Sequence, residues 1–397
     1  MPRLEHKREL MRFSGTKRVR RTRPRLGSTR WFRRYRTPVI IGWVAVLAAM
    51  AWLLFFRAEP LPVTPVAVGD VPMERAGQGP QAAPKMAAVK LPADDAPHEN
   101  VTEWWYYSGH VQTESGERYS FHMATFLRQG GLSHTAFHGS LLDHKSGKQY
   151  TDQARTEGKP ADGQPDGFGF SYGPWQMAGA GPKHSMKMAG KGFALDLAMN
   201  DSLPPVLHQV PATPVAGLLD LGAAGKSYYT SRPRLKAAGN LTIDGVSQAV
   251  KGEVWFDHQW GDFEAAQLRW NWFALQLADG ADLMIYELFD RQGGPVLRMG
   301  TYVKDAAVYP LGASDFKASA RGTWKSPSSG IVYPMDWTIT VPGKGLDLKL
   351  EPVIRHSQFD ARITTLNLYW EGAVKLSGSQ GGVGFMELSG YEGASAK

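Results

Sequence analysis

The segment Lys251–Trp260 holds the residue in this sequence that is best suited to chemistry. Its residues alternate as in a strand, on which Asp257 shares one face with Trp255 and Gln259. A carboxyl group that burial keeps protonated near neutral pH can act as a general acid, and neighbouring aromatic rings can stabilise a positive charge through their faces. Asp257 is therefore our candidate general acid. The alternative is a structural aspartate that hydrogen-bonds the backbone at a turn or holds the seam between two barrels.

Six of the eleven histidines lie between His98 and His144. His134 and His138 have the i, i+4 spacing of helical zinc sites, but their segment alternates as a strand does. On a strand the two side chains are about 13 Å apart, too far to share one ion. The chain has no cysteine, which excludes disulfides, thiolate catalysis and cysteine-based metal sites. We therefore expect neither a metal nor a cofactor, and His138 is either a ligand contact or a hydrogen-bonded core imidazole.

Aromatic residues are concentrated in segments that also have the pattern of strands. Glu103–Tyr107 contains two tryptophans and two tyrosines, and Trp270 and Trp272 face the same way on a later strand. Such rings either line a cavity or plug the end of a barrel. Glu371 and Glu387 lie in other predicted strands, where we expect them to pair with lysines and assign them no chemistry. The sequence has no Gly-x-Ser-x-Gly elbow, and its Gly-x-Gly patterns precede no predicted helix.

The elements that must hold these residues are short strands. From His98 onward, aromatic and β-branched runs recur every eight to fifteen residues between turn residues, and no helix of three turns is evident. This spacing is typical of antiparallel sandwiches and up-and-down barrels. Two domains of about 150 residues suit the length better than one of about 300. We place them at residues 98–264 and 265–393, with the Pro-rich loop Asn200–Lys226 either capping a barrel mouth or packing between the halves.

The N-terminal part of the chain has a different composition. Residues 1–37 contain fourteen Lys or Arg and carry a net charge of +12, which leaves −4 for the remainder of a chain of net charge +8. Residues 38–56 contain no charge, and nineteen residues of helix span about 28 Å, close to the hydrocarbon thickness of a bilayer. Residues 57–97 contain eight prolines, which is typical of an extended tether.

These three segments predict a single-pass anchor in a bacterial inner membrane. Because cationic flanks stay on the cytoplasmic side, the N-terminus would lie in the cytoplasm and the body beyond residue 57 in the periplasm. The alternative is a cleaved signal peptide, but large residues at 52–56 end the span and no clear small-x-small site follows them. The acidic body gives no support for nucleic-acid binding, and the Arg-rich arm is more typical of an orientation signal.

The order of these motifs resembles the carotenoid 1,2-hydratase (hydroxyneurosporene synthase) family, also called the AttH/CrtC-like lipocalin family. The matching stretches run through almost all of residues 98–393. They are Glu103–Gly109, Thr125–Arg128, His138–Asp143, Leu203–His208, Ser227–Leu235, Gly252–Gly261, Trp272–Leu277, Leu283–Tyr286, Tyr369–Val374 and Glu387–Tyr391. The resemblance implies an all-β fold of two tandem lipocalin-like β-barrels.

Hydratases of this family add water to the terminal tertiary alkene of an acyclic carotene, with an aspartic acid implicated as the proton donor. The resemblance places that role on Asp257. Two positions depart from the family pattern, because Gln259 stands where other members carry Glu and Tyr228-Tyr-Thr230 replaces the His-x-Trp of the hydratase subset. These departures weaken the case for carotenoid hydration and leave the fold prediction unchanged.

Three functional hypotheses follow. The first is a membrane-anchored, periplasm-facing protein that binds a hydrophobic lipid- or isoprenoid-like ligand, with the membrane and a membrane transporter as further partners. The second is a cofactor-free hydro-lyase with Asp257 as general acid, and the third is a structural accessory whose barrels are filled by side chains. An open interior of the first barrel reached by Asp257 would favour ligand chemistry. The expected ligand-binding residues are Trp104, Trp105, His138, Tyr228, Tyr229, Trp255, Trp260 and Trp272.

Overall fold

The computed structural model describes residues 87–130, 133–158, 167–201, 203–211, 213 and 215–392. These residues belong to one compact unit that begins at Ala82. The predicted basic arm, the predicted membrane span and residues 57–86 of the predicted linker lie outside the described residues. Within the described ranges, no helix is both long and apolar enough to cross a membrane.

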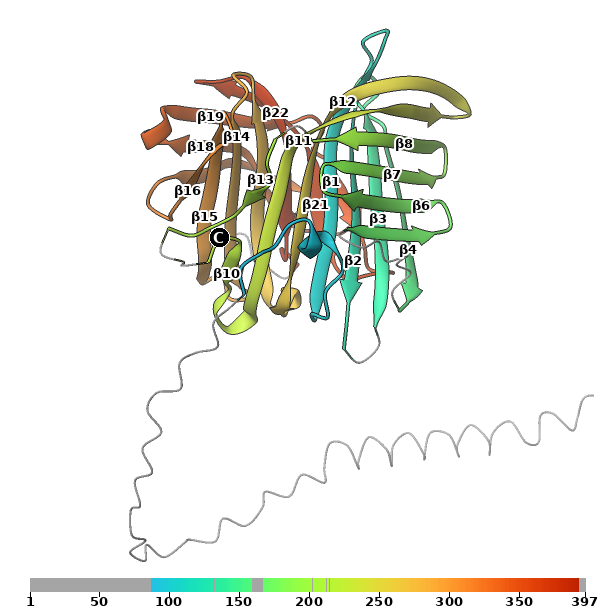
Figure 1. The fold of residues 1–397 in the computed structure, drawn as a ribbon. Helices are drawn as coiled ribbons and strands as arrows, with labels where there is room; N and C mark the ends of the chain where they lie inside the picture. The colour runs from blue at the N-terminus through green and yellow to red at the C-terminus, as the bar shows by residue number, and fades with distance from the viewer. Residues whose placement is uncertain are drawn as a thin grey trace, which may run out of the picture. The chain divides into compact units, whose positions relative to one another are not determined.

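Two antiparallel sheets make up the described chain, which confirms the predicted all-β class (Figure 1). The first sheet has twelve strands, in the order β4-β3-β2-β1-β12-β11-β8-β7-β6-β5, with β9 and β10 paired to β11. Its strands are β1 (Thr102–Thr113), β2 (Arg118–Arg128), β3 (His134–Asp143), β4 (Gln149–Glu157), β5 (Phe168–Tyr172), β6 (Trp175–Ala180), β7 (Lys183–Gly190), β8 (Phe193–Asn200), β9 (Val206–Leu207), β10 (Leu218–Asp220), β11 (Gly225–Ile243) and β12 (Val246–Phe263).

The second sheet has ten strands, in the order β16-β15-β14-β13-β22-β21-β19-β18-β17, with β20 paired to β21. Its strands are β13 (Leu268–Leu277), β14 (Asp282–Asp290), β15 (Pro295–Lys304), β16 (Ala307–Leu311), β17 (Lys317–Lys325), β18 (Val332–Val341), β19 (Leu346–Pro352), β20 (Gln358–Asp360), β21 (Leu368–Gly378) and β22 (Gly382–Ser389). Helical structure among the described residues is limited to four 3₁₀ turns, namely η1 (Ala93–Asp95), η2 (Gly222–Ala224), η3 (Ala265–Gln267) and η4 (Pro342–Lys344).

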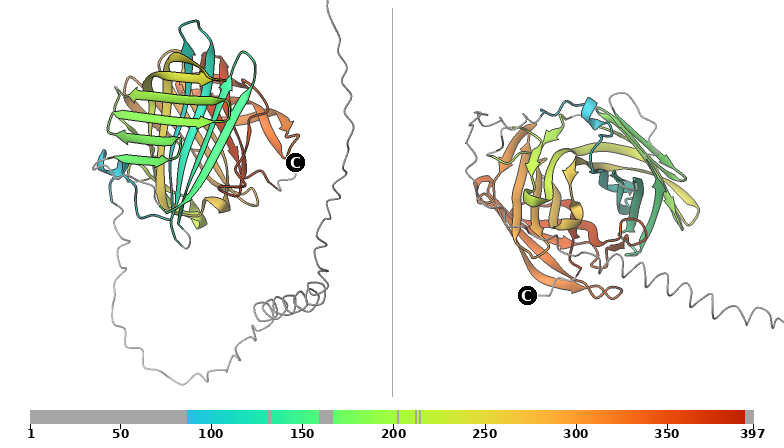
Figure 2. Two further views of the ribbon diagram at one scale, coloured as in Figure 1. Left: turned by 90° about the vertical axis from the view of Figure 1, so that its right-hand side faces the viewer. Right: turned by 90° about the horizontal axis from the view of Figure 1, so that it is seen from below.

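Each sheet curls around an interior of its own, as the view from below in Figure 2 shows. Side chains alternate between this interior and the outside, since β8 buries every second residue of Phe193–Asn200 and leaves most of the others exposed. Among the described residues, β4 and β5 at the two edges of the first sheet are not hydrogen-bonded to each other, and neither are β16 and β17 of the second. The sheets are therefore barrel-like and incompletely closed.

Side chains fill the interiors of both sheets. The first interior is an apolar core built from residues that include Trp105, Phe121 and Phe256, and the second includes Tyr333 and Trp370. All five of these side chains are almost fully buried. The first barrel therefore does not provide the open, Asp257-lined interior that would have marked ligand chemistry, because rings occupy that space.

A third apolar cluster joins the two sheets. It combines Tyr106, Tyr229 and Trp255 of the first sheet with Trp272 and Tyr286 of the second, among others. The long strands β11 and β12 contribute to this cluster with one face and to the first core with the other. The two sheets thus pack against each other through side chains that a separate barrel would expose to solvent.

Arg234 on β11 links the two sheets through hydrogen bonds at one point of their interface. Its guanidinium donates to Asp282 Oδ1 at 2.9 Å, to Glu253 Oε2 at 2.9 Å and to the carbonyl oxygens of Leu277 and Ala281, both at 3.0 Å. Asp282 is only 2% exposed, so its carboxylate depends on this partner for the solvation that water would otherwise supply. The hairpin between β13 and β14 is thereby fixed to the first sheet.

Replacing this arginine should destabilise the protein strongly. We expect Arg234→Leu to lower the free energy of unfolding by about 3 kcal/mol, because a buried carboxylate would lose its partner. The measurement is urea denaturation followed by tryptophan fluorescence. The matched control is Arg355→Leu, which breaks an exposed ion pair with Asp336 and should cost at most about 1 kcal/mol. Equal losses in the two variants would contradict the role of Arg234 as an inter-sheet clamp.

Candidate active site

A cavity of about 400 Å³ lies at one end of the seam between the two sheets. Both sheets contribute to its wall, and its aromatic lining consists of Trp104, Tyr106, Phe126, Tyr229, Trp270, Trp272, Tyr286 and Tyr369. The half-exposed Arg128 and Glu264, which form an ion pair at 2.8 Å, mark its opening together with the exposed Leu366. The wall also carries several carboxyl groups, among them Asp257, Glu371, Glu387 and Glu392, so the cavity combines aromatic rings with acids. Small-molecule sites likewise combine an apolar wall with placed polar groups.

Asp257 projects from β12 into this cavity and is 3% exposed. The Tyr229 hydroxyl donates to its Oδ2 at 2.6 Å, while the Trp255 indole Nε1 donates to Oδ1 at 2.6 Å. The Ser231 hydroxyl also donates to Oδ1. Burial raises the pKa of Asp257 from 3.8 to about 7, although the three hydrogen bonds oppose this rise by stabilising the carboxylate. The acid form is therefore well populated at neutral pH.

A layer of polar groups behind Asp257 fixes the direction of these hydrogen bonds. His208 contacts Ser231 Oγ through Nε2 at 2.6 Å and Thr301 Oγ1 through Nδ1 at 2.8 Å. Burial lowers the pKa of His208 to about 3, so the imidazole is neutral. Since the Ser231 hydroxyl donates to Asp257, the network assigns the imidazole proton to Nε2 and makes Nδ1 an acceptor from Thr301. The two sheets therefore cooperate in holding Asp257, because Thr301 lies on β15.

A pair of glutamates faces the same cavity. Glu371 and Glu387 are directly opposite each other on β21 and β22, and both line the space that Asp257 enters. The Tyr106 hydroxyl donates to Glu371 Oε1, and the Trp270 side chain hydrogen-bonds Glu387. Burial raises the pKa of both glutamates, and the charge of Glu387 raises that of Glu371 further. The pair therefore retains a proton at neutral pH.

The expectation that these two glutamates pair with lysines was wrong. Neither forms an ion pair with a lysine in the part of the chain that the structure describes, and Glu371 instead lies 3.9 Å from His122 Nε2. Each is a single acid inside an otherwise apolar strand, in the sequences Tyr-Trp-Glu-Gly and Phe-Met-Glu-Leu. Acids at such positions are rarely buried without a partner or a function, which is the signal that could have identified them.

The structure brings several of the predicted residues together. Trp104, Tyr229 and Trp272 line the cavity with Asp257, and Trp272 Nε1 donates to the Tyr229 hydroxyl oxygen at 2.8 Å. Trp255 contacts Asp257 directly through its indole N–H. The predicted acid and four of the predicted aromatic residues therefore lie together at the cavity between the two sheets.

Four other predicted residues do not line the cavity. His138 lies one layer behind it, with Nδ1 2.9 Å from the hydroxyl of Tyr369, which does line it. Trp105 is part of the first core and donates to the Asp95 carbonyl at 3.1 Å. Tyr228 and Trp260 stack with ring centroids 5.3 Å apart on the face of β11 and β12 opposite to Asp257. Strand alternation accounts for this, because these two positions are out of phase with Asp257.

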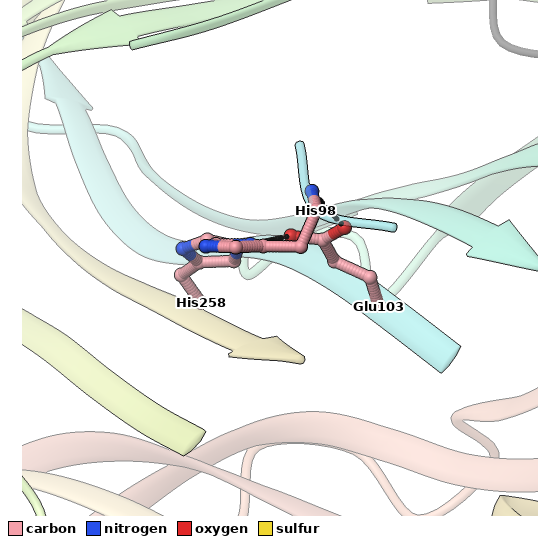
Figure 3. A group of neighbouring side chains, drawn as sticks. All are labelled: His98, Glu103 and His258. Carbon is pink, nitrogen blue, oxygen red and sulfur yellow. Dashed lines mark hydrogen bonds and ion pairs between the residues drawn. The ribbon is translucent and has the colours of Figure 1, made fainter. Parts of the chain in front are cut away.

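His98, Glu103 and His258 form a compact polar group on the first sheet (Figure 3). Their ligand atoms all lie within 4.8 Å of one another, and two histidines with one carboxylate are a familiar metal-binding set. Glu103 Oε1 is 2.8 Å from a ring nitrogen of each histidine. Burial alone would raise the pKa of Glu103, but hydrogen bonds from the two imidazoles hold it below its ordinary value.

This group was not foreseen, since its members come from segments up to 160 positions apart and only strand pairing joins them. Glu103 Oε1 joins the two imidazoles, whereas the buried Nδ1 of His258 has no hydrogen-bond partner among the described residues. His98 also stacks on Trp260 with centroids 4.5 Å apart. The group is a candidate metal centre by composition. Its evident role in the structure is to attach the segment before β1 to the end of β12.

Comparison with known proteins places this chain in a family. The AttH-like family model matches residues 81–391. Kievitone hydratase from Fusarium solani subsp. phaseoli is 22% identical over 169 residues, which cover 41% of this chain and 47% of that enzyme. The matched region thus spans about half the length of that relative.

Two solved structures share the fold. The crystal structure of an AttH-like protein from Nitrosomonas europaea has a TM-score of 0.69 and 22% identity, covering 78% of this chain and 98% of that one. The crystal structure of kievitone hydratase from Nectria haematococca has a TM-score of 0.63 and 20% identity, covering 78% and 94%. These matches confirm the resemblance drawn from the sequence motifs and the lipocalin-like fold. The chain belongs to the AttH-like family.

Proposed function

We propose that this protein is a cofactor-free hydro-lyase that adds water across the alkene of an isoprenoid-like ligand. The observation that carries the proposal is a buried aspartic acid with a pKa of about 7 in an aromatic cavity. A general acid works best when its pKa lies near the operating pH. Similarity to a hydratase across 47% of that enzyme's length supports the same reaction class.

Asp257 would deliver the proton from Oδ2. Oδ1 already accepts two hydrogen bonds, from Ser231 and Trp255, whereas Oδ2 accepts one from Tyr229. With the proton on Oδ2, the Tyr229 hydroxyl turns to accept from Asp257 and from Trp272. Its own proton then points into the cavity, where Tyr229 forms part of the wall. The acid and the tyrosine are therefore arranged as a short proton path to a bound alkene.

Protonation of an alkene carbon leaves a carbocation, and the cavity wall suits that charge. The faces of Trp and Tyr rings attract cations, and Trp272 and Tyr286 both lie in the wall beside Tyr229. Water then attacks the cation and releases a proton, so that one water is consumed and no redox change occurs. The Glu371–Glu387 pair can accept this proton, which balances the one that Asp257 donates to the alkene. Asp257 regains its proton from the pair or from solvent before the next turnover.

We also propose that the catalytic body is held at the periplasmic face of an inner membrane by residues 38–56. The support is the uncharged span behind an Arg-rich arm. A membrane location suits a hydrophobic substrate, since such molecules concentrate in lipid.

The proposed acid can be tested by Asp257→Asn, which is nearly isosteric and cannot be an acid. We expect kcat to fall by about 10²- to 10⁴-fold with binding retained, because only the proton donor is removed. The assay follows the gain of one water by mass spectrometry over a panel of isoprenoid and prenylated alkenes, with affinity measured separately by tryptophan quenching. Asp196→Asn, on the exposed face of β8, is the matched control. Binding without turnover in the wild type would instead indicate a carrier.

The alkaline limb of the pH profile, where activity falls as the pH rises, should respond to a change at Ser231. Activity requires protonated Asp257, so kcat should fall as the pH rises above about 7. Because folding raises this pKa, the residue's contribution to stability is present below its ordinary value of 3.8 and is lost as the pH rises through 7. Ser231→Ala removes a donor to the carboxylate and should move the limb upward by about one pH unit. An unchanged limb would exclude Asp257 as the titrating acid.

The proposed position of the body on the periplasmic side of the membrane can be tested in intact spheroplasts, with the full chain tagged at its C-terminus. Protease added outside should remove the body beyond residue 57 and leave the basic arm protected. Lysed spheroplasts serve as the control, in which the arm is digested as well. Protection of the body in intact spheroplasts would contradict the periplasmic orientation.

A further inference from the structure

We propose that the loop 361–367 contacts a lipid bilayer through Ile363 and Leu366 and so places the cavity mouth at the membrane surface. The hydrophobic ligand of the proposed reaction would then enter directly from the lipid. The contact itself does not depend on the reaction, whereas the direction of ligand entry rests on the proposed function.

The first observation is the exposure of these two side chains. Ile363 is 77% exposed and Leu366 is 80% exposed, more than any other large apolar residue of the described chain. The next is Val246, at 63%, in a distant hairpin turn of the first sheet. Single exposed apolar residues are ordinary on protein surfaces, but the two most exposed here lie three residues apart on one loop. Their transfer from water into the apolar part of a bilayer would be favourable.

The second observation is where the loop lies. It connects β20 to β21 of the second sheet, and Thr365, Leu366 and Asn367 line the cavity. Leu366 thus borders the opening of an aromatic cavity and is also exposed to the outside. An apolar side chain at such a place shortens the path that a hydrophobic molecule must take through water.

The loop is held rigidly in this position. Backbone N–H groups of Thr364, Thr365 and Leu366 all donate to the carbonyl oxygen of Ala361, at 2.8–3.1 Å. Leu366 has a φ of +64°, a left-handed conformation that bulky residues rarely adopt and that persists only where the surroundings enforce it. The loop therefore presents Leu366 outward at a cost in backbone strain, which is typical of a functional position.

The loop is also tied to the first sheet. Thr364 Oγ1 is 2.8 Å from His138 Nε2 and donates to Gln153 Oε1 at 2.6 Å. The Arg155 guanidinium donates to the Thr364 carbonyl oxygen at 2.9 Å. Contacts with both sheets thus fix the height of Ile363 and Leu366 above the cavity opening.

The surrounding charges favour a lipid surface as the partner. Arg155 is exposed beside the loop, and Arg291 lines the cavity, where its guanidinium donates to the Ala266 carbonyl oxygen. Neither arginine forms an ion pair with a carboxylate of the described residues, and cations near a membrane surface attract anionic headgroups. Arg362 on the loop itself is ion-paired with Asp360. Two apolar tips flanked by cations suit insertion into a headgroup layer, whereas a stable protein interface needs a broad complementary surface.

The absence of cysteine allows a direct test with the full chain. Ile363→Cys carries an environment-sensitive fluorophore, and the protein is placed in nanodiscs of phosphatidylethanolamine and phosphatidylglycerol with or without brominated acyl chains. We expect brominated lipid to quench the label at 363 at least threefold more than a label at Val246→Cys. The control position is also apolar and exposed, but lies far from the cavity.

Equal quenching at the two positions, or none at 363, would overturn the proposal. Shielding of the label only on addition of another protein, without lipid quenching, would also overturn it and point to a protein partner. A second variant, Ile363→Ser, changes a side chain that does not line the cavity and should slow turnover of bilayer-embedded alkene several-fold while turnover of detergent-dispersed alkene stays unchanged. The quenching result requires no turnover, so it decides the membrane contact even if the proposed hydratase activity fails.

Discussion

The burial of one carboxyl group between two sheets is the constraint on which the rest of this structure depends. Asp257 would be an ordinary ionised acid on the surface of an isolated barrel. In the seam it loses water, and its pKa rises to about 7 in spite of three hydrogen bonds that favour the carboxylate. Desolvation therefore outweighs hydrogen bonding here, and the second sheet supplies that desolvation through the cluster around Trp272 and Tyr286.

The two barrel-like sheets form a single chemical unit for the same reason. Strand β12 presents Val254 and Phe256 to the first core and Trp255 and Asp257 to the seam. The acid thus comes from one sheet, whereas the two glutamates that complete the polar set come from the other. Filled interiors give each sheet its own stability, and the cavity is left to the space between them. Such sites between two rigid bodies are common places for ligand chemistry.

Much of the fold could be predicted from the sequence, because strand alternation and turn residues are local signals. The shared face of Trp255, Asp257 and Gln259 follows from residue parity alone. The same parity puts Trp260 on the opposite face, so its prediction as a ligand contact disregarded this signal, and Tyr228 stacks on Trp260 on that face. The resemblance to the family supplied the two-barrel arrangement, which local patterns left open between a sandwich and a barrel.

The remaining site residues depend on contacts between distant segments. Glu371 and Glu387 reach Asp257 only because two sheets pack face to face, and no spacing in the sequence encodes that approach. His98, Glu103 and His258 are joined by the pairing of β1 with β12 and by the segment that precedes β1. In both cases the only sequence signal is an ionisable residue among apolar neighbours. This signal indicates a functional position but does not show which other residues it contacts in the fold.

The central claim is that Asp257 is a protonated acid near neutral pH, and an infrared titration of the carboxyl carbonyl stretch tests it most directly. The spectrum of the wild type minus that of Asp257→Asn isolates this one group and needs no substrate. The account predicts a protonated-carboxyl band that disappears with a midpoint near pH 7. A band that is already absent at pH 5, as for an ordinary aspartate, would contradict it.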